Sequence, residues 1–280
     1  MPLRTDLALE SIMPDDLPET VHIVKRGRHF RITDITIDDD SCISSTGKGK
    51  GRYIILETSD MSRYSEDHKA MAKELSEEIK RFIPKGEVLF AGLGNSDITP
   101  DAIGPLTAAK ILATRHIRRE LKEECGLFDL RPVSVLANGV LGQTGIETAE
   151  LVKAVSDAVK PSAIIAADAL ACSDISRLGT TIQISDAGIS PGSGVANARK
   201  ELTEKVMGVP VIAIGIPTVV DMHTIVRSLT GMDIHDDMPN MMVTPRDIDR
   251  LTERASQLLA YGINLALQPS MNFEDVQGIF

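Results

Sequence analysis

Cysteine is scarce in this sequence, and its cysteines show no pattern of a disulfide framework or a zinc site. Cys42, Cys125 and Cys172 are odd in number and widely spaced, and they include no C-x-x-C pair. Such usage is typical of proteins in a reducing compartment, where disulfides are rare. The sequence therefore predicts a cytoplasmic protein without disulfide bonds.

Long apolar runs and an excess of positive charge are also missing. No run approaches the ~20 residues of a membrane-spanning helix, and residues 1–7 lack the apolar core of a signal peptide. Lys and Arg number 30 against 40 Asp and Glu, which gives a net charge of -10. This balance argues against a nucleic-acid-binding surface but leaves a basic protein open as substrate. We expect no direct contact with membrane or nucleic acid.

Nucleotide-binding motifs are incomplete. The stretch 47–52 (GKGKGR) lacks the G-x-x-x-x-G-K-[ST] spacing of a P-loop and is better interpreted as a mobile basic loop. Gly92-Leu-Gly94 continues without the third glycine of a dinucleotide fingerprint, and no acidic residue follows at a suitable strand end. The sequence therefore does not indicate a bound nucleotide, and we expect no cofactor.

Metal motifs and serine nucleophiles are incomplete as well. The six histidines include no H-E-x-x-H pair, and only His223 falls near the expected cleft, where a lone histidine is more often a packing residue. Residues 188–192 match G-x-S-x-G, but Pro191 follows Ser190 and has no N–H to donate to an oxyanion. Ser193 escapes this objection but has no histidine marked as its partner. We expect neither a bound metal nor a serine hydrolase.

What the sequence does contain, after residue 65, is an alternation of strands and helices. Apolar segments predict the strands, and segments with helical periodicity predict the helices. The predicted strands are Val88–Ala91, Val133–Ala137, Ala163–Ala167, Thr180–Ile184 and Val211–Gly215. The predicted helices are about 65–82, 101–116, 146–159, 197–207, 218–229 and 245–267. This alternation predicts a three-layer α/β/α fold with a mostly parallel sheet, of the phosphorylase/hydrolase-like type.

The first 60 residues follow a different pattern. Residues 1–20 have no clear periodicity and are interpreted as an arm, and three β-branched segments after them predict a small antiparallel meander. The segments are Val21–Lys25, His29–Ile37 and Arg52–Glu57. We therefore predict one domain, 1–280, with an arm and β meander over 1–60 and an α/β core over 65–267. A hydrophobic content of 42% and a charged content of 25% are typical of a soluble globular protein.

The loop after the first core strand carries the strongest signal. Gly92 and Gly94 allow a sharp turn, Asn95 follows, and Thr99-Pro100 is a helix start signal. Asp101 would then lie in the first helical turn at the carboxyl end of a strand, which is the edge where open α/β sheets usually hold their sites. By itself, a carboxylate there most often stabilises the helix dipole.

A second carboxylate, Asp168, follows the apolar strand 163–167. By itself it would be interpreted as an N-cap, but two carboxylates at adjacent strand ends could form an acid–base pair with different pKa values. Helix-terminal N–H groups favour ionised Asp101 as the base, and the apolar strand favours protonated Asp168 as the acid. The reverse assignment stays open.

The loops after the other strands add polar residues to the same expected edge. They are Gly145, Glu147, Asp186 and Ser193. Because the carboxyl ends of the strands should gather along one edge, we expect these residues to line a cleft with Gly92, Gly94 and Asn95. The residues alone thus predict a hydrolytic α/β enzyme that uses two aspartates. A non-enzymatic binding module, in which both aspartates are purely structural, is a competing interpretation.

Longer blocks of the sequence resemble the germination proteases of endospore-forming bacteria, peptidases that degrade small acid-soluble spore proteins. The blocks occur along nearly the whole chain and include 3–8, 49–53, 92–95, 99–102, 144–148, 168–171, 181–186, 191–195, 208–221 and 242–245. The resemblance implies an endopeptidase of the spore core or forespore, made as a zymogen that matures by self-cleavage near its N-terminus and assembled as a homotetramer. Since block 3–8 typically follows the family's cleavage point, we expect either that little pro-segment precedes it or that the sequence represents a form already near its mature start.

The resemblance also implies a fold shared with hydrogenase-maturation endopeptidases, in which the positions matching Asp101 and Asp168 are the proposed catalytic pair. Those maturation enzymes bind a metal there with a further histidine. This sequence has no evident histidine at such a loop, so a metal-free, aspartate-dependent mechanism is predicted. One aspartate would activate a water and the other would protonate the departing amide nitrogen. A metal-dependent maturation endopeptidase of the same fold is the alternative.

Overall fold

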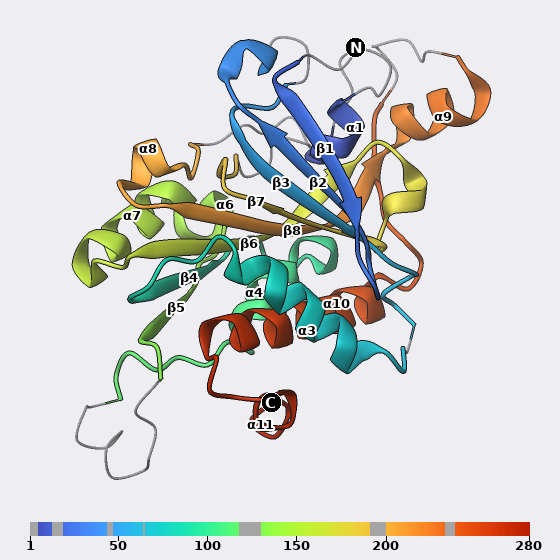
Figure 1. Ribbon diagram of the computed structural model, residues 1–280. Coiled ribbons are helices and arrows are strands. Elements are labelled where there is room, and N and C mark those ends of the chain that lie inside the picture. The colour runs from blue at the N-terminus through green and yellow to red at the C-terminus, as the bar shows by residue number, and fades with distance from the viewer. Residues whose placement is uncertain are drawn as a thin grey trace.

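The computed structural model describes residues 5–12, 19–43, 47–63, 65–117, 130–190, 200–232 and 239–280. Among these residues, nine strands form one sheet in the order β1-β2-β3-β7-β8-β6-β4-β5, with β9 paired to β8 (Figure 1). Its parallel part consists of β4 (Val88–Gly92), β5 (Val133–Ala137), β6 (Ala163–Cys172) and β8 (Val211–Asp221). The predicted α/β class is therefore confirmed.

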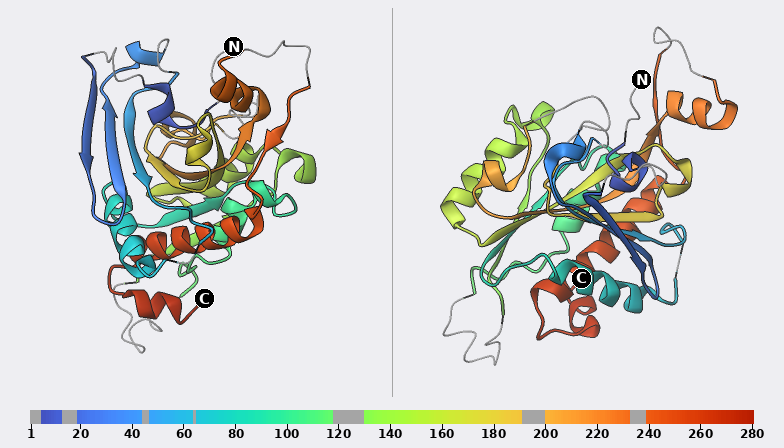
Figure 2. Two further views of the ribbon diagram at one scale, coloured as in Figure 1. Left: turned by 90° about the vertical axis from the view of Figure 1, so that its right-hand side faces the viewer. Right: turned by 45° about the horizontal axis from the view of Figure 1, so that its top comes forward.

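The predicted N-terminal meander is present and joins the same sheet. It consists of β1 (Val21–Arg26), β2 (Arg31–Ile37) and β3 (Gly51–Glu57). β3 pairs antiparallel with β7 (Thr181–Ser185), and β7 pairs antiparallel with β8, so the sheet as a whole is mixed. The meander strands turn away from the plane of the parallel strands (Figure 2), and α1 (Ala8–Ser11) packs against them through Ala8 and Tyr53.

Helices cover both faces of the parallel strands, which gives the predicted three layers (Figure 1). On one face lie α3 (His68–Lys80), α4 (Ile103–Ala108), α10 (Ile248–Leu267) and α11 (Phe273–Gln277). On the other lie α7 (Thr148–Val159) and α8 (Glu204–Met207). Successive side chains of β4 point to opposite faces of the sheet. Val88 and Phe90 therefore pack in the core under the first group of helices, and Leu89 and Ala91 pack in the core under α7 and α8.

The remaining short elements lie at the ends of the strands. They are β9 (Met242–Val243), α6 (Leu141–Thr144), α9 (Met222–Thr230) and the 3-10 turns η2 (Asp40–Cys42), η3 (Thr99–Asp101) and η4 (Ile175–Arg177). None of the helices in the described part of the chain is both long enough and apolar enough to cross a bilayer.

Two strands are longer than the apolar runs predict. β6 and β8 stay paired past Asp168, as far as Cys172 and Val220. The N-terminal segment adds a further partner, because the Asp6 N–H donates to the carbonyl of Ala171 at 2.9 Å. Asp168 therefore lies inside a strand and not at its end. Both strands are extended because they pair with backbone groups of distant segments. Local strand propensity does not reveal these partners.

Three helices are shorter than predicted. In place of a helix over 101–116, the turn η3 leads into α4, which ends at Ala108. The Leu112 N–H donates to Asn264 Oδ1 of α10 at 2.9 Å, so a side chain from another helix takes the place of a helical carbonyl. In the segment 197–207 only α8 is helical among the described residues, and α9 begins at Met222 because β8 continues to Asp221.

A cluster of charged side chains ties α3 to the meander. Arg26 donates to both carboxylate oxygens of Glu78, at 2.5 and 2.7 Å, and to Asp34 at 2.9 Å. Arg52 donates to both oxygens of the same Asp34, at 2.9 and 2.7 Å. Asp34 and Glu78 are buried, so each depends on its arginines for compensation of its charge.

We expect the protein to lose stability as the pH falls below about 4, with Asp34 contributing part of the loss. Burial opposes the charged form of Asp34, but the hydrogen bonds and charges of Arg52 and Arg26 outweigh burial and hold its pKa below the ordinary value of 3.8. Because this pKa is depressed in the folded state, the stabilisation is present above the unfolded-state pKa and is lost as the pH falls through the folded-state pKa.

Thermal melts between pH 7 and pH 2 measure this contribution. The variant Asp34→Asn should be less stable at pH 7 and should lose less stability on acidification than the parent. An acid-dependent loss equal to that of the parent would show that Asp34 has no such linkage.

Candidate active site

Asp101 is held over the exit of β4 by a tight turn. Its Oδ2 accepts the N–H of Asn95 at 2.8 Å. A Cβ at Gly94 would lie 2.1 Å from the Asp101 carbonyl oxygen, and Gly94 has φ +113°, a region that favours glycine. The turn η3 packs against β6 and β8, where Thr218 Oγ1 donates to the carbonyl of Pro100 at 2.7 Å. The turn therefore presents Asp101 at the carboxyl ends of the parallel strands.

Asp168 lies on the adjacent strand at the same level. Gly92, the last residue of β4, pairs with Ala167 of β6, and the Leu93 N–H donates to the Ala167 carbonyl at 2.8 Å. Asp168 is the next residue of β6, is 5% exposed, and accepts the N–H of Ala169 through Oδ1 at 2.9 Å. The structure thus brings Asp101, in the turn that follows β4, next to β6, the strand that holds Asp168.

The close packing of α4 against these strand ends depends on a glycine that the sequence analysis did not single out. A Cβ at Gly104 would lie 2.1 Å from the carbonyl oxygen of Leu93 and 2.4 Å from that of Ala167. A Cβ at Gly92 would in turn lie 2.3 Å from the Gly104 carbonyl oxygen. Gly92 and Gly104 therefore let the helix after Asp101 approach both strands. The sequence signal for this contact is the pair Gly104-Pro105, which comes shortly after Asp101.

Asn95 connects the Asp101 turn to the loop after β5. Its side-chain Oδ1 accepts the N–H of Asp97 at 2.9 Å and the Gln143 Nε2–H at 2.6 Å. Gln143, in α6, also donates to Asp97 Oδ2 at 3.1 Å. Gln143 was not predicted as a site residue, although it lies in the polar run between β5 and α7. These hydrogen bonds hold the loop after β4 and the loop after β5 together.

The connection from β5 to α7 contains two predicted cleft residues and one that was missed. Gly145 ends α6 with φ +70°, and Glu147 is the N-cap residue of α7. The missed residue is Asn138, which is 3% exposed. Among the described residues, neither polar side-chain atom of Asn138 has a hydrogen-bond partner, and Glu147 Oε2 has none either.

One predicted cleft residue, Asp186, does not follow a strand that ends at the edge near Asp101. The expectation that all strand ends meet at one edge is wrong for β7, which pairs antiparallel with β8 through Ser185 and Ala213. Asp186 therefore follows the end of β7 that lies toward the amino end of β8, where its Oδ1 accepts the Arg52 N–H at 2.7 Å. Ser193 falls outside the described residues.

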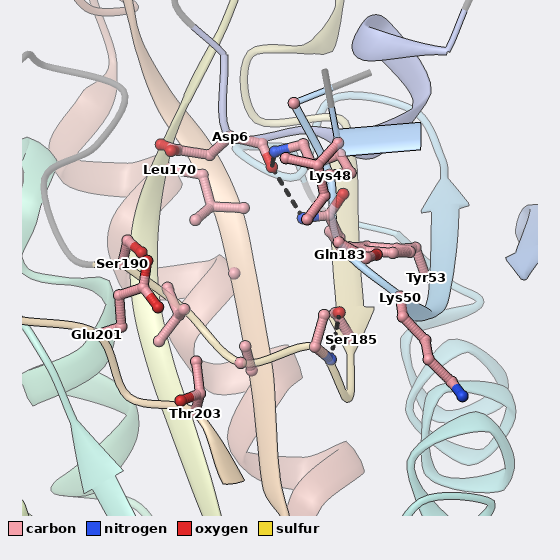
Figure 3. Close-up of a pocket in the computed structure, with 18 of the residues that line it drawn as sticks. Asp6, Lys48, Lys50, Tyr53, Leu170, Gln183, Ser185, Ser190, Glu201 and Thr203 are labelled. Carbon is pink, nitrogen blue, oxygen red and sulfur yellow. Dashed lines mark hydrogen bonds between the residues drawn. The ribbon is translucent and has the colours of Figure 1, made fainter. Parts of the chain in front are cut away.

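A cavity of about 700 Å³ lies beside the β6–β8 pair (Figure 3). Leu170 and Gly215 are among its lining residues, and Gly215 is the β8 partner of Asp168. Parallel partners direct their side chains to the same face, and so do residues two apart in a strand. Asp168 therefore points to the face of the sheet that holds the cavity, beside Gly215, where a Cβ would lie 2.5 Å from the Leu170 side chain.

The N-terminal segment forms one wall of this cavity. Gln183 Nε2 and Lys48 Nζ both donate to the Asp6 carbonyl, at 3.0 and 2.8 Å, and Ala8 N–H donates to Gln183 Oε1 at 2.7 Å. Burial lowers the pKa of Lys48, against the opposing effect of the Asp6 and Glu10 carboxylates. The lining therefore combines main-chain groups with side chains of both charges.

The described residues do not form a three-ligand metal site. No group of three His, Cys, Asp or Glu side chains in that part of the chain could hold a metal ion. His223 lies at the start of α9, beyond the end of β8, where its N–H donates to Asn240 Oδ1 at 3.3 Å. Two carboxylates without a third ligand do not fit the carboxylate–histidine set of a metal-dependent endopeptidase, so no metal-dependent step is derived.

We expect Gly94→Ala to lower any activity that depends on Asp101 by about 10-fold or more, because a methyl group at φ +113° would push on the Asp101 backbone and misplace its carboxylate. Gly208→Ala is the matched control, since Gly208 also has positive φ, +78°, but nothing lies within 4 Å of its Cβ position. Activity and melting temperature should be measured for both. Equal activity losses in the two variants would contradict a specific effect on Asp101.

The sequence as a whole is similar to proteins of one family. The family model described as germination protease matches residues 16–233. The germination protease of Clostridium tetani is 37% identical over an alignment that covers 99% of this chain and 98% of the relative. The germination proteases of Caldanaerobacter subterraneus and Bacillus velezensis are 38% and 42% identical, over 98% and 79% of this chain and 97% and 63% of theirs.

Among solved structures, the [NiFe] hydrogenase maturation protease HycI from Thermococcus kodakarensis is similar, with a TM-score of 0.38 and 19% identity over 66% of this chain and 98% of that one.

Proposed function

Since this chain belongs to the germination protease family, we propose that it is an endopeptidase that begins the degradation of small acid-soluble spore proteins during germination. The observation that carries the proposal is that Asp101, in the turn after β4, lies next to β6, the strand that holds Asp168, with a cavity of about 700 Å³ on the face of the sheet to which Asp168 points. Two carboxylates at such an edge can divide the roles of general base and general acid.

In the proposed reaction, one aspartate removes a proton from a water that attacks the scissile carbonyl carbon. The other aspartate gives a proton to the departing amide nitrogen as the C–N bond breaks, so that one water is consumed for each bond cleaved. The two carboxyl groups exchange their protonation states in each cycle, and bulk water restores them. No other group has to change its charge.

The surroundings of the aspartates favour Asp101 as the base. Asp101 is half-buried and accepts an N–H from Asn95, which stabilises a negative charge. Asp168 also accepts one N–H, from Ala169, but it is 5% exposed on an apolar strand, and burial disfavours the charged form of a carboxylate. We therefore assign the initial proton to Asp168, which would donate it to the leaving nitrogen.

The cavity is the proposed entry for the protein substrate. It opens on the face of the sheet that holds Asp168, and its walls offer both main-chain groups and charged side chains for an extended peptide. The family resemblance also supports a zymogen matured by self-cleavage, a homotetramer and a location in the spore. Mass spectrometry of the purified chain and light scattering test the first two of these.

The proposed function is tested by incubating the protein with a small acid-soluble spore protein and mapping the products by mass spectrometry. We expect cleavage at a few defined internal bonds, with the same products in the presence of EDTA. Loss of cleavage with EDTA and its return with zinc or nickel would replace the proposal by a metal-dependent endopeptidase. Failure of the fully processed protein to cleave at all would favour a binding module with structural aspartates.

A further inference from the structure

Asn138 is an unusual residue at the site edge, because its side chain is buried and uses none of its hydrogen-bonding groups. The residue is 3% exposed, and neither Nδ2 nor Oδ1 has a partner among the described residues. Buried carboxamides are nearly always bonded, since an unmet donor or acceptor loses its contacts with water without replacement. Asn138 is an exception to this rule next to a candidate active site, which indicates that its carboxamide forms hydrogen bonds with a ligand.

Asn138 is aligned with the aspartate edge. Gly92 of β4 pairs with Ala137 on one side and with Ala167 on the other. The next residues of the outer strands, Asn138 and Asp168, are therefore level with one another, two strand spacings or about 10 Å apart. Strand alternation directs both side chains to the same face.

The neighbouring residues form a polar site with apolar edges. Gln143 and Asn95 join the loop after β5 to the Asp101 turn at 2.6 Å. Around this joint lie three large apolar side chains that are exposed to solvent. They are Ile98 (53%), Leu141 (38%) and Ile146 (45%). Glu147 Oε2, in the same connection, is a second buried atom without a described partner. Apolar side chains at the rim with unpaired polar atoms inside fit an extended peptide, which offers apolar side chains and a polar main chain.

On the basis of this alignment, and of the peptidase activity proposed above, we propose that Asn138 binds the main chain of the substrate. Oδ1 accepts one peptide N–H and Nδ2 donates to one peptide carbonyl, which is the pair of groups that an extended residue presents. An extended peptide advances about 3.3 Å per residue, so a contact about 10 Å from Asp168 falls about three residues from the scissile bond. Both atoms are buried in the structure, so the contact requires that they become exposed when the substrate binds.

An ester scan of the substrate tests this assignment. Peptides spanning a mapped cleavage site are made with single amide N–H groups replaced by ester oxygens, at each position except the scissile bond, and hydrolysis of the scissile amide is followed. One ester about three residues from that bond should lower kcat/KM of the parent enzyme by roughly 10-fold, through KM. In Asn138→Ala the same ester should have no further effect, because the contact is already lost.

A second variant separates the two contacts. Asn138→Asp keeps an acceptor and loses the donor, so the sensitive ester should still weaken binding while the all-amide peptide binds less tightly than to the parent. Asn264→Ala is the matched control, because Asn264 is also buried but its amide bonds Leu112 and Lys110 within the fold, at 2.9 and 2.8 Å. It should lose stability and keep the parental ester pattern.

Two results would overturn the assignment of Asn138. One is an unchanged kcat/KM of Asn138→Ala with the all-amide peptide. The other is an ester pattern in Asn138→Ala that equals the parental one at every position, which would mark Asn138 as a packing residue. If the parent enzyme cleaves no peptide, the proposed function itself fails and the inference fails with it. Cleavage with an unaltered ester pattern refutes only the role of Asn138.

Discussion

Asp168→Asn is expected to lower the rate of peptide hydrolysis by about 10²–10⁴-fold while the protein remains folded, since a positioned general acid or base contributes an effect of this size. Asparagine has nearly the same shape and keeps an oxygen that can accept the Ala169 N–H now bonded to Oδ1. What it loses is the exchangeable carboxyl proton. The measurement is kcat/KM on a mapped cleavage site, with circular dichroism as a check of folding.

Asp101→Asn should have an effect of similar size for the same reason, because the amide oxygen can still accept the Asn95 N–H. If the two aspartates act as one unit, the double variant should be about as slow as the slower single variant, because removing one member already disables the pair. A loss of rate in the double variant equal to the product of the two single losses would indicate that the two residues act in separate steps.

A control for these substitutions is Asp157→Asn. Asp157 lies near the carboxyl end of α7, the end opposite Glu147. Asp157 is exposed and forms a surface ion pair with Lys153 at 2.5 Å, so the same chemical change should leave activity unaltered. Retention of full activity in either Asp101→Asn or Asp168→Asn would refute the acid–base pair.

Glu74→Ala is expected to lower the free energy of unfolding by about 3 kcal/mol or more, which would be the largest stability effect of the substitutions considered. Glu74 lies on α3, is 8% exposed and accepts three backbone N–H groups of the turn between β1 and β2. The donors are Arg28 at 2.8 Å, His29 at 2.7 Å and Phe30 at 3.2 Å. Alanine would leave these donors without their acceptor and would detach the turn from the helix.

Chemical denaturation with a comparison to Glu77→Ala measures this effect. Glu77 is on the same helix and is exposed, so its substitution should change stability by no more than about 0.5 kcal/mol. Glu74→Gln should fall between the two, because an amide keeps one accepting oxygen and presents an N–H to the other donors. Equal losses for Glu74→Ala and Glu77→Ala would show that the three bonds contribute nothing net.

The fold class and one aspartate loop follow from the sequence for physical reasons that are local. Buried parallel strands read as continuous apolar runs, and helices between them keep their periodicity, so the α/β alternation appears in the order of residues. The turn at Gly94 and the position of Asp101 follow in the same way, because a positive φ near a strand exit requires glycine.

The longer strands and the edge at which each loop lies were decided by tertiary contacts. Local propensity does not show that β7 runs antiparallel to β8, which carries Asp186 away from Asp168. It also does not show that Asp6 would pair with Ala171 or that Asn264 would bond Leu112 and end a helix. The last two of these depend on a partner more than 100 residues away in the chain, and the first joins strands that are separated by a long connection.

The sequence by itself determined that this chain is an α/β protein with Asp101 at a glycine-shaped strand exit and Asp168 after an apolar run. Only the tertiary structure decided that β4 and β6 are neighbours, which brings the Asp101 turn next to Asp168, and that Asn138 is level with Asp168. The physical reason is that strand order and register are set by pairing and packing between distant segments, whereas turns and periodicity are written in adjacent residues.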